Sequence, residues 1–223
     1  MEPTPPEQPQ QPLTESRALK SMTIYDEHGK SPFGVQPLQN PRRTVFISFS
    51  QSDRTEVDQF VYRWTQQDRV FISKTVGTAF GNDLINSDRA DYVISRIRTD
   101  YLADSTITLV LIGSCTHSRR FIDWEIKASL RQGETYTPNG LLGILLPPLA
   151  SAHLPPRFAA NWNRQELNCY ARYRPAPTSA QQLRDWLEDA YEARTSRARF
   201  ISNSNEMMGY NARCIVCGVT HPA

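Results

Sequence analysis

In this sequence of 223 residues, the side chain best suited to take part in a reaction is that of Glu125. It lies in the segment Phe-Ile-Asp-Trp-Glu-Ile, close to the aromatic residues Phe121 and Trp124. Aromatic neighbours that partly exclude water raise the pKa of a carboxyl group, which suits it to stabilise a developing cation or to move a proton. Acidic residues early in a helix also interact favourably with the helix dipole, and Asp123 fits that structural role equally well. The spacing alone leaves both roles open.

Two short polar segments each follow an apolar stretch. Residues 48–52 read Ser-Phe-Ser-Gln-Ser, and residues 113–117 read Gly-Ser-Cys-Thr-His. If both stretches are parallel strands, these segments meet at the carboxyl edge of one sheet, where open α/β sheets bind ligands. Serine and glycine are also the residues that turns require, so a purely structural role remains an alternative.

Other kinds of chemistry find less support in the sequence. The glycine-rich motifs that cradle dinucleotides and triphosphates do not occur, and no histidine accompanies a nucleophile elbow. Cys214, Cys217 and His221 offer three soft metal ligands, whereas a structural zinc site needs four, and the fourth would have to come from far along the chain. We assign no metal at this stage, leaving open a zinc knuckle or an incidental pair of thiols.

The elements that position these residues alternate between apolar runs and amphipathic segments, which favours βαβ units. We expect a flavodoxin-like α/β domain with an open parallel sheet of four to five strands, helices on both faces, and the run at residues 106–112 in the centre. The expected strands span residues 45–49, 69–73, 106–112, 141–146 and, as the fifth, 166–173. The expected helices begin near residues 53, 87, 118 and 178.

Composition divides the chain into three parts and indicates which partners and which cellular compartment to expect. Residues 1–42 are rich in proline and predict a disordered tail, residues 43–195 the α/β domain, and residues 196–223 a C-terminal extension or mobile tail. A formal net charge of +2 argues against nucleic acid or a membrane surface as partner. The sequence lacks a secretory signal and an apolar run long enough for a membrane span, and its four scattered cysteines fit a reducing compartment. We therefore expect a cytoplasmic protein.

Two boxes of the sequence carry a family resemblance. Residues 46–53 (Phe-Ile-Ser-Phe-Ser-Gln-Ser-Asp) resemble the first box of TIR domains, and residues 105–125 resemble the TIR-like proteins of the Thoeris antiphage system, of the ThsB type. The boxes occur in the family's order, and the resemblance covers about residues 44–146. It implies an enzyme that cleaves the bond between nicotinamide and ribose in NAD and releases an ADP-ribose-type signal, cyclic or linear.

The resemblance also assigns residues to roles. Glu125 aligns with the family's catalytic glutamate, and NAD is a substrate, so no cofactor is expected. A separate effector protein would respond to the nucleotide signal, and self-association into a homo-oligomer stays open. The remaining substrate-binding residues implied are Ser48, Phe49 and Ser50 along the crevice, Phe121 and Trp124 in its wall, and Asp83 in a loop that closes over it.

Two positions depart from the family's pattern, and two other functional classes remain. Phe121 stands where many relatives have Trp, and Ser50 where close ones carry His or another large side chain, which leaves the pocket shape and the product open. The alternative function is a noncatalytic TIR-like signalling module that acts by self-association. A phosphoacceptor domain of the response-regulator type would need an acidic cluster and a lysine at the strand ends, and only Asp53 fits.

Overall fold

A computed structural model describes residues 41–75, 89–134 and 136–222 of the chain. Apart from Pro41, all of them belong to one compact unit, Arg42–Ala223. Within this described part, none of the helices has the length and apolar character needed to cross a bilayer.

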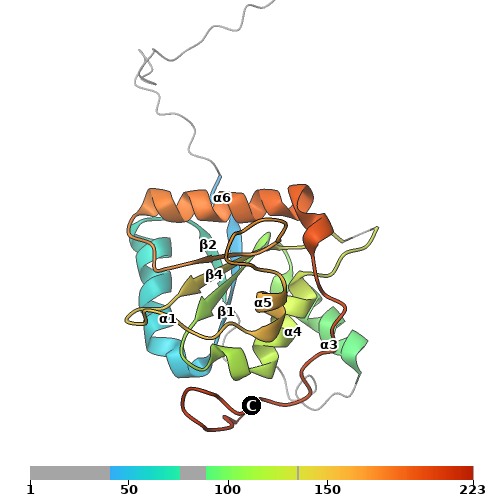
Figure 1. The fold of residues 1–223 in the computed structure, drawn as a ribbon. Coiled ribbons are helices and arrows are strands. Elements are labelled where there is room, and N and C mark those ends of the chain that lie inside the picture. The colour runs from blue at the N-terminus through green and yellow to red at the C-terminus, as the bar shows by residue number, and fades with distance from the viewer. Residues whose placement is uncertain (1–40, 76–88, 135, 223) are drawn as a thin grey trace, which may run out of the picture. The chain divides into compact units, whose positions relative to one another are not determined.

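Five parallel strands form a single sheet in the order β2-β1-β3-β4-β5 (Figure 1). This is the strand order of flavodoxin-like folds. It confirms the predicted fold class and the central place of the third strand. The strands are β1 Thr44–Phe49, β2 Ile72–Thr75, β3 Ile107–Ile112, β4 Gly140–Leu145 and β5 Arg172–Arg174.

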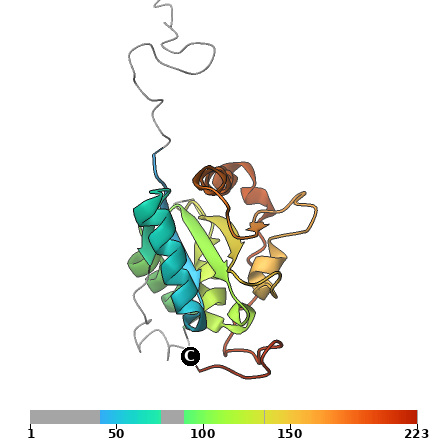
Figure 2. The same ribbon diagram turned by 90° about the vertical axis from the view of Figure 1, so that its left-hand side faces the viewer.

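Helices cover both faces of this sheet (Figures 1 and 2). Residues of α1 and α6 pack with one face, whereas those of α3, α4 and α5 pack with the other. Two helices continue as a π-helical turn, α1 through Arg63–Gln67 and α3 through Ile97–Leu102. The helices are α1 Arg54–Tyr62, α3 Ala90–Arg96, α4 Arg120–Ser129, α5 Pro156–Ala160 and α6 Ala180–Ser196.

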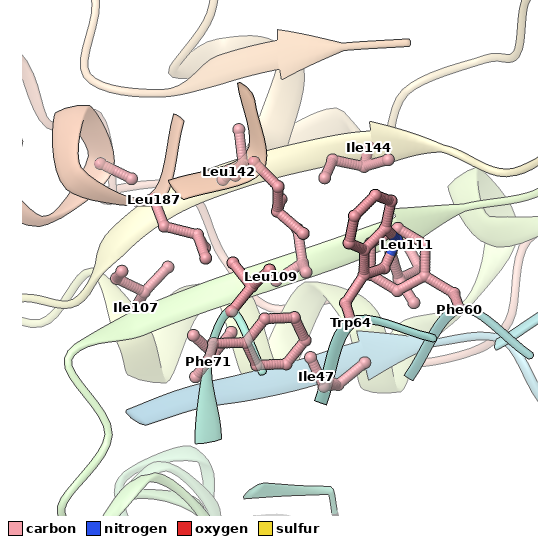
Figure 3. Packing of buried hydrophobic residues seen from close by; sticks show 14 of the residues in the cluster. Ile47, Phe60, Trp64, Phe71, Ile107, Leu109, Leu111, Leu142, Ile144 and Leu187 are labelled. Carbon is pink, nitrogen blue, oxygen red and sulfur yellow. The ribbon is translucent and has the colours of Figure 1, made fainter. Parts of the chain in front are cut away.

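The largest core cluster lies between the sheet and the α1/α6 layer (Figure 3). Alternate residues of β3, such as Leu109 and Leu111, point into it and meet Trp64 from the end of the first helix. The α6 layer approaches the sheet so closely that a Cβ atom added at Gly140 would lie 1.9 Å from the Ala190 carbonyl oxygen. Only glycine fits this position in β4.

Two strands differ from their predicted limits. The second begins at Ile72 rather than Arg69, because Arg69 has a φ of 48° and cannot continue a strand, although Val70 and Phe71 are buried as expected. The fifth is confined to Arg172–Arg174, because the residues before it turn through positive φ at Glu166 and Asn168. The short helix α5 was not predicted.

The segment after α6 packs along α4 and ends at the carboxyl edge of the sheet (Figures 1 and 2). The Lys127 ammonium donates to the Asn205 carbonyl over 2.8 Å, and Ala212 N donates to the Ser118 carbonyl over 2.9 Å. Of the two options left open by the sequence, the structure therefore shows a packed extension.

Candidate functional site

The strand order creates a topological switch point between β1 and β3. The chain leaves β1 through α1 on one face of the sheet and leaves β3 through α4 on the other face. Such a divergence opens a crevice beyond the carboxyl ends of the two strands, which is where open α/β sheets bind ligands. Both polar segments singled out in the sequence follow these strands, with Ser50 after β1 and Gly113 after β3.

Glu125 lies in the second turn of α4 and turns its carboxyl group toward β1. Ser48 Oγ donates to Glu125 Oε2 over 2.5 Å, joining residues that are 77 positions apart in the sequence. Ser48 is fully buried and Glu125 is 7% exposed. The Ser129 hydroxyl donates to the Glu125 carbonyl over 2.7 Å, which fixes the backbone of the same turn. The carboxyl group is thus held inside the fold, close to the edge of the sheet.

Burial dominates the electrostatics of Glu125. It raises the pKa of the carboxyl group from 4.5 to about 8, and the hydrogen bond from Ser48 offsets part of that rise by favouring the ionised form. The carboxyl group is thus desolvated, as the sequence led us to expect. A carboxyl group with such a pKa gains or loses a proton near neutral pH, which is a property of acid–base groups in active sites.

Asp123, the second acidic residue of this helix, has a different role. Its carboxylate forms a bidentate ion pair with Arg157 of α5, at 2.8 and 3.3 Å, and both side chains are almost fully buried. Met208 N donates to the same carboxylate over 2.9 Å. Asp123 is therefore fully engaged in tying α4 to α5 and to the C-terminal segment, which leaves Glu125 as the carboxyl group of α4 near the switch point.

The two loops at the switch point contact each other through polar side chains. Arg119 Nε donates to the buried Ser50 Oγ over 3.0 Å, so the start of α4 is joined to the end of β1. Asp53 reaches across to the other loop, where a Cβ atom added at Gly113 would lie 2.2 Å from its carboxylate. Thr116 Oγ1 donates to Asp53 over 3.4 Å, and burial raises the pKa of Asp53. The floor between the loops is closely packed.

The two residues expected to form the crevice wall, Phe121 and Trp124, both lie on α4. The rings of Phe121 and Trp124 meet edge to face at 5.3 Å, and both belong to the cluster beneath α3. The indole N–H of Trp124 donates to the Met208 carbonyl over 2.8 Å, so the C-terminal segment fixes this ring.

One predicted substrate-binding residue, Phe49, does not join the Ser48–Glu125 pair. Phe49 packs with the α1/α6 cluster, on the opposite face of the sheet, as the alternation of side chains along β1 requires. Asp83 lies outside the described residues.

A cavity of about 270 Å³ lies at the opposite end of the strands. Its lining includes Ser105 and Asn139, which directly precede β3 and β4. This cavity therefore belongs to the amino edge of the sheet and is separate from the switch point.

Comparison with known families identifies the domain. The family model described as Thoeris protein ThsB, TIR-like domain, matches residues 46–150. Residues 46–150 are a TIR-like domain of the Thoeris ThsB family. The chain therefore contains a TIR-like domain of the kind that the Thoeris protein ThsB carries. No protein of the curated set matches the chain.

Several residues around the TIR-like site had no signal in the sequence. Arg157 follows two prolines in a segment without a predicted element, and only the fold shows that it neutralises Asp123. Arg119 reaches Ser50, which is 69 positions away in the sequence. Cys115 lies beside the C-terminal cysteines, about 100 positions away in the sequence. Long-range pairs of this kind leave no local periodicity or motif.

Proposed function

We propose that this TIR-like protein cleaves the bond between nicotinamide and ribose in NAD, releasing an ADP-ribose-type product, linear or cyclic, as a signal in antiphage defence. One observation carries the proposal: a carboxyl group, that of Glu125, is held by Ser48 at the β1/β3 switch point of a domain of the ThsB family. NAD is the substrate, no further cofactor takes part, and a separate cytoplasmic effector protein responds to the product.

For this reaction the protein has to supply mainly a negative charge at the correct position. The bond between C1′ of the ribose and the nicotinamide nitrogen breaks with its electron pair going to the nitrogen, so the cationic ring leaves as neutral nicotinamide. The sugar becomes oxocarbenium-like, and a nearby carboxylate stabilises that positive charge. Water then attacks C1′ and loses a proton, or a nitrogen of the adenine attacks in its place and closes a ring. Glu125 in its ionised form supplies the negative charge, while Ser48 holds the carboxyl group in place.

Access to Glu125 requires a local movement. With the residue 7% exposed, a ribose can reach both carboxyl oxygens only when a neighbouring group is displaced. Binding of substrate or assembly of several copies would provide the energy for that movement, so we expect slow turnover by the isolated protein and faster turnover after a trigger.

The same burial supports a second candidate function. If Glu125 never opens, its hydrogen bond to Ser48 serves only to tie α4 to β1, and the domain acts by self-association without catalysis. The two functions make opposite predictions for one experiment.

The test is chromatographic detection of nicotinamide after incubation of the purified protein with NAD. Glu125→Gln should abolish release, whereas Glu192→Gln, which changes an exposed glutamate on α6, should leave it unchanged. Turnover that survives Glu125→Gln contradicts the assigned mechanism. Lack of turnover at every protein concentration and with infected-cell extract, together with concentration-dependent oligomers in light scattering, would establish the noncatalytic alternative.

A further inference from the structure

We propose that the protein binds a zinc ion through Cys115, Cys214, Cys217 and His221, and that this ion fastens the C-terminal segment to the loop after β3. The proposal is independent of the NAD chemistry, because none of these residues belongs to the Ser48–Glu125 pair. It supplies the fourth ligand that the sequence alone could not identify.

The four side chains already form a cluster with the dimensions of a tetrahedral site. Their ligand atoms all lie within 4.8 Å of one another. The Cys115 sulfur lies 3.3 Å from that of Cys214 and 3.7 Å from that of Cys217. Zinc–sulfur bonds of about 2.3 Å in a tetrahedron place two sulfurs about 3.8 Å apart. The Cys217 sulfur lies 3.3 Å from His221 Nε2, where a zinc site needs about 3.6 Å. The remaining ligand pairs lie within 4.8 Å, so movements of up to about 1 Å would bring all four ligand atoms to these distances.

The backbone of the C-terminal turn directs these ligands to one point. Gly218 takes a φ of 72°, a conformation that favours glycine, and its N–H donates to the Cys214 carbonyl over 2.8 Å. Cys214 N in turn donates to the Val219 carbonyl over 2.9 Å. The turn that carries Cys214 and Cys217 is therefore closed by its own backbone hydrogen bonds.

A disulfide explains this arrangement less well than a metal does. All three cysteines are free thiols, and a disulfide would use two of them and leave the third thiol and the imidazole without a role. Three thiolates and one imidazole form a closed four-ligand set, which is typical of structural zinc. Cys217 is exposed and His221 is half-buried, so an ion can enter from solvent, while Cys115 and Cys214 anchor it to the fold.

Zinc binding at this cluster would stabilise the beginning of α4. The turn is attached to the loop after β3 by Ile215 N, which donates to His117 Nε2 over 3.3 Å. Just before the turn, the side-chain oxygen of Asn211 accepts from Arg120 N over 2.8 Å and so caps the first turn of α4. An ion that joins Cys115 to Cys214 would hold this cap in place. We therefore infer a structural role, in which zinc keeps the C-terminal segment on the helix that carries Glu125.

Metal analysis of the full chain, purified without a histidine tag, tests the site directly. Inductively coupled plasma mass spectrometry should find about one zinc per chain. Cys214→Ser and Cys217→Ser should each reduce this content at least about tenfold, because incomplete ligand sets bind zinc weakly. The control is Cys169→Ser, which changes a buried cysteine that is not part of the cluster and should keep the full zinc content.

Two further measurements cover variants that fold poorly. Cobalt added to the metal-free wild-type protein should produce the visible absorption of a tetrahedral thiolate site. A zinc chelator should accelerate tryptic cleavage after Arg213 in the wild-type chain, and added zinc should reverse the effect. The proposal is overturned if the reduced protein neither contains nor takes up zinc, if both cysteine variants retain it, or if intact-mass analysis shows that the native thiols form a disulfide.

Discussion

Replacing Glu125 with Gln should make the stability of the protein depend less on pH, because it removes a buried group that must ionise. In the folded protein the pKa of Glu125 is about 8, whereas its ordinary value is 4.5. Between these values the folded chain keeps a proton that the unfolded chain loses, so the folded state binds more protons and its stability falls as pH rises. The contribution of Glu125 is fully present below pH 4.5 and is lost as pH rises through 8.

The magnitude follows from the pKa difference. The difference between a pKa of about 8 and one of 4.5 corresponds to about 5 kcal/mol over the whole window, of which about 3 to 4 kcal/mol falls between pH 5 and pH 8. Glutamine resembles the protonated carboxyl group in size and can still accept the hydrogen bond from Ser48, so it lacks this penalty. Relative to wild type, the free energy of unfolding of the Glu125→Gln protein should therefore rise by about 3 to 4 kcal/mol between pH 5 and pH 8.

Urea unfolding at pH 5, 6, 7 and 8, followed by tryptophan fluorescence, measures the difference between the two proteins at each pH. Contributions from all other titrating groups cancel in that difference. Glu192→Gln serves as the matched control, and its difference from wild type should stay flat because this side chain is exposed. A flat difference for Glu125→Gln as well, or one that favours wild type increasingly toward pH 8, would show that the carboxyl group is not buried as described.

Three other predictions follow from the same structure. If Glu125 acts as a carboxylate on NAD, kcat/KM should rise about tenfold per pH unit below pH 7 and level off above about pH 8, and initial rates of nicotinamide release that are flat from pH 6 to 9 would contradict this. Arg157→Met should cost about 3–5 kcal/mol in denaturant unfolding because it leaves the Asp123 carboxylate buried and unpaired, and adding Asp123→Leu should recover part of the loss. Gly140→Ala should destabilise the fold by about 3 kcal/mol, since its Cβ would lie 1.9 Å from the Ala190 carbonyl oxygen, and an unchanged unfolding midpoint would show that α6 can move away.

The pattern of apolar residues was enough to predict those strands that are buried along all or most of their length. The runs that became β1, β3 and β4 are apolar on both faces, so their type, limits and central position could be inferred without tertiary information. The prediction was wrong where backbone conformation overrides composition. Positive φ at Arg69 and Glu166 starts the second and fifth strands later than their apolar residues suggest. Val70 and Phe71, which follow Arg69, are buried as predicted, but they precede the strand and are not part of it.

The candidate site was predictable to the extent that topology governs it. Once β1 and β3 are neighbours, Ser48 and Glu125 must approach the same edge, and their hydrogen bond realises that expectation. Which face each side chain takes was harder to foresee. Strand alternation assigns Ser48 to the α4 face and Phe49 to the α1/α6 face, so these neighbours in sequence cannot line one crevice together.

The position of Glu125 depends on two supports that act on opposite sides of α4. On the sheet side, Ser48 binds the carboxyl group directly. On the outer side, successive residues of the helix bind the C-terminal segment, with Asp123 accepting from Met208 N, Trp124 donating to the Met208 carbonyl, and Lys127 donating further along. A helix fixed on one side only could rotate or shift when the other side is released. The C-terminal segment therefore belongs to the mechanical support of the site, and detaching it should affect Glu125 without altering any residue of the crevice.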